Sequence, residues 1–223
     1  SIAWDLKGRF WLSEVNLATF ETRSRRIEPA PQGESVSMLH PVSGRLWAVE
    51  GGRGEVYEAD VDTGTVRKLG GGPNPEVHYK ASLYWNPVTG RVGSFGGYGR
   101  FRVNNKRHEF DERLRQWIEV KESPGGPVPW PRTGQDRSLI AGSDPTRIFM
   151  EGGSGSPSGI QAREVKGLRG FNSQFHNLDD VWELDLKSNR WTELLPNARF
   201  PEAPDKSSIF FYHPKFDGLV LLK

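Results

Sequence analysis

Cysteine is missing from this 223-residue sequence. Its absence excludes a disulfide framework, a thiolate nucleophile and a cysteine-based zinc site. Long apolar runs are missing as well, because no stretch reaches the roughly 18 apolar residues that a membrane-spanning helix needs. The Asn-x-Ser/Thr signal for N-glycosylation is also absent. We therefore expect no membrane insertion, and none of these absences assigns the protein to a compartment.

An excess of charge of one sign is missing too. The 30 Lys and Arg residues nearly balance the 28 Asp and Glu residues, and the net charge is only +2. This balance predicts no nucleic-acid partner. Apolar residues do not recur at the i, i+3, i+4, i+7 spacing of a helix, whereas 26 glycines and 16 prolines indicate many turns. The sequence therefore predicts an all-β protein.

One type of segment recurs along the chain, in which two short apolar strands flank a proline-containing turn. Two glycines follow the second strand in three copies. The copies are SMLHPVSGRLWAVEGG (37–52), SLYWNPVTGRVGSFGG (82–97), SLIAGSDPTRIFMEGG (138–153) and a truncated SIFFYHPKFDGLVLLK (208–223). Proline fixes φ and lacks an N–H, so it belongs in a turn and not in mid-strand. The repeat predicts four β-hairpins.

A second segment follows each glycine pair, and it runs Glu, apolar, Asp, with an apolar or Trp residue six positions after the Asp. Its copies are VYEADVDTGTV (56–66), RHEFDERLRQW (107–117), VWELDLKSNRW (181–191) and a weaker LSEVNLATFET (12–22). The Asp or Asn can accept backbone N–H bonds two residues on, as in an Asx turn. Two hairpins in succession give a four-stranded antiparallel unit of about 45 to 75 residues, a period typical of propellers and solenoids.

In this combination the sequence resembles the kelch-type β-propeller family. The resemblance rests on the glycine pairs, on an aromatic-type residue after each pair and on a residue nine positions later. PRTGQ (131–135) also resembles the segment that opens many kelch blades. The resemblance implies that the glycines end the second strand where blades crowd, and that the aromatic residues pack between blades. The structural residues that it implies are Gly51, Gly52, Gly96, Gly97, Gly152, Gly153, Trp117, Trp182 and Trp191.

The hairpin count predicts a single domain, residues 1–223, with about four blades. The expected blades are 35–69, 78–120, 132–195, and 207–223 together with 1–28. The two chain ends would share the last blade by pairing segments 10–16 and 217–222, which removes exposed strand edges. One alternative is a fragment of a larger six- or seven-bladed propeller. In another, SIAWDLKGRFW forms an inner hairpin of a degenerate first blade and the ring stays open.

The connections between each glycine pair and the next template Glu grow along the chain, from 6 to 12 to 30 positions. In similar propellers these loops project from one face, and long loops on a rigid scaffold often carry function. We therefore predict a ligand-binding face formed by loops 98–107 and 154–180. Its candidate residues are Tyr98, Arg100, Phe101, Arg102, Asn104, Arg132, Gln135, Arg163, Arg169, Phe171, Gln174, Phe175 and His176.

No catalytic or metal-binding constellation is identified in the sequence. His40 and His213 share one turn position with Asn86 and are interpreted as turn residues. No His-x-His or His-Glu-x-x-His cluster occurs, so no metal and no cofactor are predicted. The glutamates that recur at one repeat position are interpreted as structural or solvent-facing: Glu14, Glu58, Glu109 and Glu183.

These observations favour a non-catalytic binding or scaffolding propeller that recognises a protein or peptide partner. A carbohydrate-directed protein is the alternative, either lectin-like or an epimerase or lyase that acts on an acidic sugar. In that case the loop arginines would hold a carboxylate, and His176 or a nearby acid would move protons. Either protein would be a monomer or a homodimer.

Overall fold

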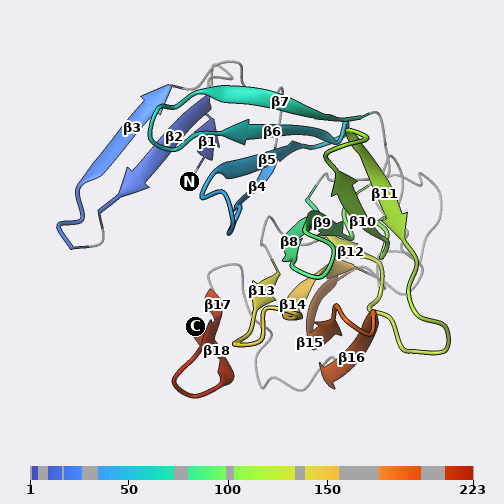
Figure 1. Ribbon diagram of the computed structural model, residues 1–223. Helices are drawn as coiled ribbons and strands as arrows, with labels where there is room; N and C mark the ends of the chain where they lie inside the picture. Colours follow the sequence, from blue (N-terminus) through green and yellow to red (C-terminus); the bar gives the residue numbers. More distant parts are fainter. Residues whose placement is uncertain are drawn as a thin grey trace, which may run out of the picture.

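The computed structural model describes residues 2–4, 10–16, 18–26, 35–72, 80–98, 103–133, 139–155, 176–196 and 209–222. Every regular element in these ranges is a β-strand, and the strands form five antiparallel sheets. The sheets follow one another in chain order along an open arc (Figure 1). Among these residues no helix has the length and apolar character needed to cross a membrane. The predicted all-β class is confirmed.

The first three sheets are consecutive in the sequence. The N-terminal sheet contains β1 (Ile2–Trp4), β2 (Phe10–Val15) and β3 (Thr22–Arg26). The second contains β4 (Ser35–Leu39), β5 (Leu46–Glu50), β6 (Glu55–Ala59) and β7 (Val66–Gly71). The third contains β8 (Ser82–Asn86), β9 (Arg91–Phe95), β10 (Arg107–Asp111) and β11 (Gln116–Val120).

The last two sheets differ in size. The fourth has five strands: β12 (Arg132–Thr133), β13 (Ile140–Ala141), β14 (Arg147–Gly155), β15 (His176–Asp185) and β16 (Arg190–Leu195). Both β12 and β13 pair with β14, so the first strand of this sheet is split in two. The C-terminal hairpin contains β17 (Ile209–His213) and β18 (Gly218–Leu222). The predicted repetition of four-stranded antiparallel units is confirmed in the second and third sheets.

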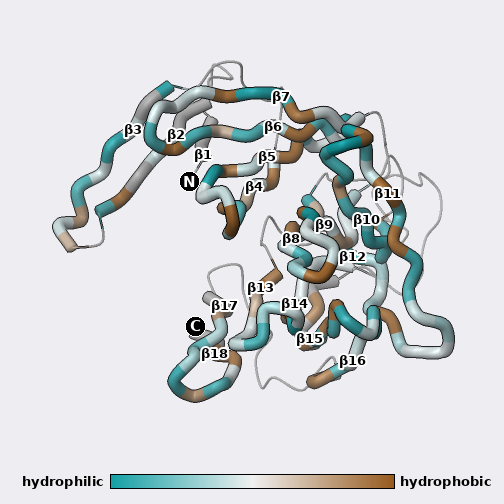
Figure 2. The backbone as a smooth tube through the Cα atoms, in the orientation of Figure 1, coloured by the Kyte–Doolittle hydropathy of each residue, from teal (hydrophilic) through white to brown (hydrophobic). Residues whose placement is uncertain are grey.

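The core lies between neighbouring sheets. One face of the third sheet packs against the second sheet, through residues such as Phe110 and Trp47. Its other face packs against the fourth sheet, where the rings of Phe95 and Trp191 lie 5.0 Å apart. Trp191 and Trp182 are buried, and Trp117 is half-buried with its indole N–H donating to the Gly54 carbonyl of the second sheet at 2.7 Å. Within the sheets, hydrophobic and hydrophilic segments alternate over short distances (Figure 2).

The two ends of the chain do not pair with each other. β2 is the central strand of the N-terminal sheet, between β1 and β3, and β18 pairs with β17 alone among the described strands. The predicted pairing of segments 10–16 and 217–222 is therefore wrong. β1 takes the edge of β2 because a short local connection costs less chain entropy than joining the two ends. This pairing agrees with the alternative in which the first residues form a degenerate inner hairpin.

Asx turns form at the predicted template positions in the second hairpin of each unit. The side-chain oxygens of Asn16 and Asp185 accept backbone N–H bonds at 2.9 and 2.8 Å, and those of Asp60 and Asp111 accept them at 2.8 Å. These N–H donors lower the pKa of the Asp60 and Asp111 carboxyls. A side-chain oxygen acceptor within each turn therefore stabilises the hairpins locally.

His40 and Asn86 cap equivalent turns in the first hairpin. His40 Nδ1 accepts N–H bonds from Val42 at 3.3 Å and from Ser43 at 3.2 Å, and Asn86 Oδ1 accepts one from Val88 at 2.9 Å. The prediction that His40 is a turn residue is confirmed. His213 lies at the corresponding turn of the C-terminal hairpin, but its Nδ1 has no hydrogen-bond partner among the described residues.

Protonation of His40 should destabilise the protein. Burial lowers the pKa of His40 from 6.5, although Glu112 and Glu58 oppose this effect. A neutral imidazole is also needed to accept two N–H bonds. The unfolded state then binds more protons below about pH 6.5, so the free energy of unfolding falls with the pH. We expect His40→Asn, which copies Asn86, to reduce this slope between pH 7.5 and 5.5 in urea denaturation. Equal slopes for the two proteins would contradict the expectation.

Candidate functional site

Strand β12 joins the third sheet to the fourth. The Arg132 N–H donates to the Asn104 carbonyl at 3.0 Å, and the Arg132 carbonyl accepts the Gly97 N–H at 2.8 Å. On its other side, β12 pairs with β14, where Arg132 lies opposite Gly155. Gly155 lies in turn opposite His176, the first residue of β15. The bases of the two predicted ligand-binding loops therefore meet at this strand, which we call the β12 junction.

The loop after β9 is closed at its base. Tyr98 and Val103 form an isolated β-bridge, and the Asn104 N–H donates to the Gly97 carbonyl at 3.1 Å. The side-chain oxygen of Asn104 accepts the Lys106 N–H at 3.0 Å. Asn104, which the sequence analysis proposed as a ligand-binding residue, therefore holds the base of the loop in place.

Four of the predicted site residues fall within the described part of the chain. Tyr98, Asn104 and Arg132 have described side chains, and His176 is described by its backbone position in β15 alone. All four lie at the β12 junction. The other candidates lie outside the described residues, namely Arg100, Phe101, Arg102, Gln135, Arg163, Arg169, Phe171, Gln174 and Phe175.

Arg132 forms a buried ion pair with Asp180. Its two terminal nitrogens donate to the two carboxylate oxygens at 2.6 and 2.7 Å, and both side chains are at most 2% exposed. The guanidinium also donates to the carbonyls of Gly152 at 2.8 Å and Trp130 at 2.9 Å. The Trp182 indole N–H donates to the same carboxylate at 2.7 Å. An enclosed guanidinium with these partners cannot reach an outside ligand, so the ligand-binding role predicted for Arg132 does not fit.

Two glycines allow the close approach of backbones at the junction. Gly96 has a φ of +68°, and a β-carbon there would lie 2.6 Å from the Arg132 carbonyl oxygen. Gly153 has a φ of +103°, and a β-carbon there would lie 2.4 Å from the Thr133 carbonyl oxygen. Only glycine tolerates both the left-handed backbone and this crowding. Gly52, by contrast, has open space around it.

The sequence analysis missed Trp130. Its side chain is 37% exposed, two residues before Arg132, whereas the neighbouring Pro129 is buried. The Asn105 side-chain amide donates to the Pro129 carbonyl at 3.0 Å, which holds this segment against the loop 98–107. One signal could have identified it: PGGPVPWP (124–131) contains a tryptophan outside both repeat templates.

The recurring glutamates are tied to neighbouring strands and turns. Glu58 is buried and accepts bonds from Arg45 at 2.8 Å and Arg67 at 2.7 Å. Glu109 accepts bonds from the side chains of Asn86 and Thr89, and Glu183 accepts bonds from Nε and Nη2 of Arg147. Among the described residues, no three His, Asp or Glu side chains are grouped as a metal site. These acids therefore stabilise the sheets.

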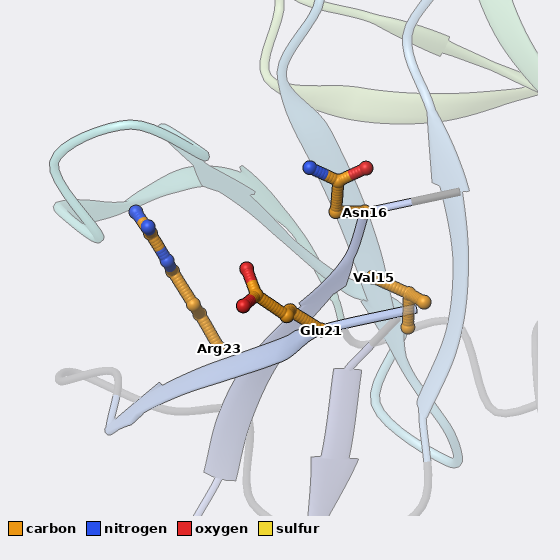
Figure 3. Close-up of a pocket in the computed structure, with 4 residues that line it drawn as sticks. All are labelled: Val15, Asn16, Glu21 and Arg23. Atoms are coloured by element: carbon orange, nitrogen blue, oxygen red, sulfur yellow. The ribbon is translucent and has the colours of Figure 1, made fainter. Parts of the chain in front are cut away.

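Two open depressions are also present among the described residues. One, of about 290 Å³, is at the β2–β3 turn and is lined by Val15, Asn16, Glu21 and Arg23 (Figure 3). The other, of about 550 Å³, lies along β15 and β16. It is lined by Pro127, Glu183, Asp185, Ser188, Arg190, Trp191, Thr192 and Glu193. Asn16, Glu183 and Asp185 already hold turns or ion pairs. The β12 junction is therefore the better candidate site.

A scan against protein-family models and a search of the curated proteins find no match for this chain. The resemblance to the kelch family therefore rests on the residues quoted above. Any function has to be argued from the β12 junction itself.

Breaking the buried ion pair should destabilise the protein strongly. Asp180→Ala leaves the Arg132 charge buried and uncompensated, which costs about 3–5 kcal/mol. Lys187→Ala removes an exposed pair with Asp144 (3.4 Å) and should change stability little. Urea denaturation of both variants measures the difference. A similar loss of unfolding free energy in the two variants would contradict the conclusion that the Arg132–Asp180 pair is buried.

Crowding at Gly96 can be separated from backbone strain. Gly90 has nearly the same φ, +67° against +68°, but no atom lies within 4 Å of a β-carbon there. Gly90→Ala should therefore lose only the strain of a left-handed alanine, about 1–2 kcal/mol. Gly96→Ala should lose about 1–3 kcal/mol more through overpacking. Equal losses in chemical denaturation would show that the Arg132 carbonyl does not limit the side chain.

Proposed function

We propose that this chain is a kelch-type β-propeller module that binds a protein or peptide partner through loops 98–107 and 154–180. The repeated four-stranded sheets, packed face to face, support the propeller. So do the tryptophans between sheets, since Trp117 contacts Gly54 and Trp191 packs on Phe95. Propellers commonly use such repetition to build a rigid ring.

The observation that carries the proposal is the junction at β12. β12 holds the base of loop 98–107 through Gly97 and Asn104, and it pairs with Gly155 at the start of the longer loop. Gly155 pairs in turn with His176 at the end of that loop. Two long loops whose bases meet on a packed scaffold are suited to recognition.

Binding is favoured over catalysis because the charged groups of the junction satisfy one another. Arg132 and Asp180 are enclosed and paired, so neither is placed to exchange a proton with a ligand. A general acid or base has to come within hydrogen-bond reach of its substrate. The junction therefore serves as the support of a binding surface.

Loop replacement tests this proposal. In one variant a Gly-Gly link replaces residues 99–102, in a second a short Gly-Ser link replaces residues 157–174, and in a control the β2–β3 turn at residues 17–20 is replaced. Each protein is applied to a peptide array and to a glycan array. We expect peptide binding by the parent and the control, and its loss in both loop variants. A glycan signal that Arg100→Ala and Arg102→Ala abolish would support the carbohydrate alternative, and binding unaffected by the loops would refute both.

A further inference from the structure

The apolar residue of the Glu-apolar-Asp template is buried in three sheets and exposed in the first. Phe110 and Leu184 are fully buried in the cores that their sheets share with the preceding sheet, and Ala59 is buried as well. Val15 occupies the same template position in β2, and it is 50% exposed. One apolar face of the N-terminal sheet is therefore open to solvent.

Phe20 at the β2–β3 turn adds to this open face. It lies four positions after the template Asn16, and Gly64, Arg115 and Asn189 lie at the same distance from their template Asp. All four residues have a left-handed backbone, and the φ of Phe20 is +58°. This conformation is unfavourable for a bulky side chain. Phe20 is nevertheless 78% exposed, so burial within the chain does not offset the strain.

The equivalent turns of the third and fourth sheets hold the outer strand of the sheet before them. The Arg115 guanidinium donates to the Leu69 carbonyl of β7 at 2.7 Å, and the Arg115 carbonyl accepts the Gly71 N–H at 2.9 Å. The Asn189 side-chain amide donates to the Lys121 carbonyl, directly after β11, at 2.6 Å. In both interfaces, the left-handed residue of the turn therefore contacts the end of the preceding outer strand.

The end of β16 is an outer-strand surface that stays exposed. β7 and β16 share a bulge, because the pairing register skips Leu69 in one strand and Leu194 in the other. Leu69 is buried beneath the third sheet, whereas Leu194 and Leu195 are each 40% exposed. The C-terminal hairpin packs on β14 instead, where the rings of Tyr212 and Phe149 stack 6.4 Å apart. The end of β16 therefore resembles β7 without the turn that covers it.

The chain carries both halves of one unmade sheet-to-sheet contact. The halves lie on the first and fourth sheets of the open arc (Figure 1). We infer that Val15 and Phe20 of one copy cover Leu194 and Leu195 of a second copy of this chain. Because two different surfaces meet, the contact is heterologous, and copies join head to tail into a ring or a filament. This self-association does not depend on the proposed binding function.

The contact between copies differs in chemistry from the one at β7. Pro196 takes the place of Gly71 in the β16 register and has no N–H to donate, and the Phe20 side chain has no donor either. The two surfaces match instead as apolar side chains, so hydrophobic burial supplies the affinity. The association should therefore persist at about 0.5 M salt, which screens exposed charges.

Sedimentation velocity at increasing protein concentration tests the contact. The parent protein should self-associate, and Phe20→Gly and Leu194→Asp should each raise the dissociation constant at least about tenfold. Val42→Asp is the matched control and should associate like the parent, because Val42 is 74% exposed at the β4–β5 turn. Glycine fits a left-handed turn, so Phe20→Gly should not lower the melting temperature.

Single cysteines identify the two surfaces, because the chain has no cysteine of its own. An oxidised mixture of Phe20→Cys and Leu194→Cys should give a disulfide-linked mixed dimer, and a mixture of Val42→Cys and Leu194→Cys should not. A bridge within one chain of the double variant F20C/L194C, in place of one between chains, would refute the inference. So would a parent protein that stays monomeric at every concentration, or equal association of Phe20→Gly and Val42→Asp.

Discussion

The buried ion pair between Arg132 and Asp180 is the interaction on which the candidate site depends. The guanidinium binds Asp180 and the Gly152 carbonyl, and the backbone of the same residue binds Gly97 and Asn104. One arginine therefore connects β15, the end of β9 and the bases of both long loops. Burying two charges is costly, and the cost is offset here because each charge has several partners in good geometry.

Close contact between sheets is the second constraint. Neighbouring sheets share aromatic contacts, such as Trp191 on Phe95 and the Trp117 N–H on the Gly54 carbonyl. Gly96 brings the third sheet close enough for the Gly97 N–H to reach Arg132. A scaffold packed in this way changes shape little, so variation and recognition concentrate in the connections between strands.

Local features were predictable from the sequence, and long-range pairing was less so. The Asx turns at Asp60 and Asp111 and the turn at His40 form as expected, because a side chain acts on backbone groups two or three residues away. The pairing of segments 10–16 and 217–222 was expected because the hairpins at the two chain ends would together complete one blade. The structure instead pairs β2 with β1, because a nearby strand competes at lower entropic cost for the same edge.

The sequence by itself determined the all-β class, the two alternating hairpins and the positions from which long loops emerge, since periodicity and turn chemistry are local properties. Only the tertiary structure decided which side chains are enclosed and which are available. Arg132 resembles the loop arginines in sequence, yet it is buried because Asp180 lies 48 positions later in the chain and meets it in space. Trp130 resembles a core residue, yet it is exposed, whereas its neighbour Pro129 is buried.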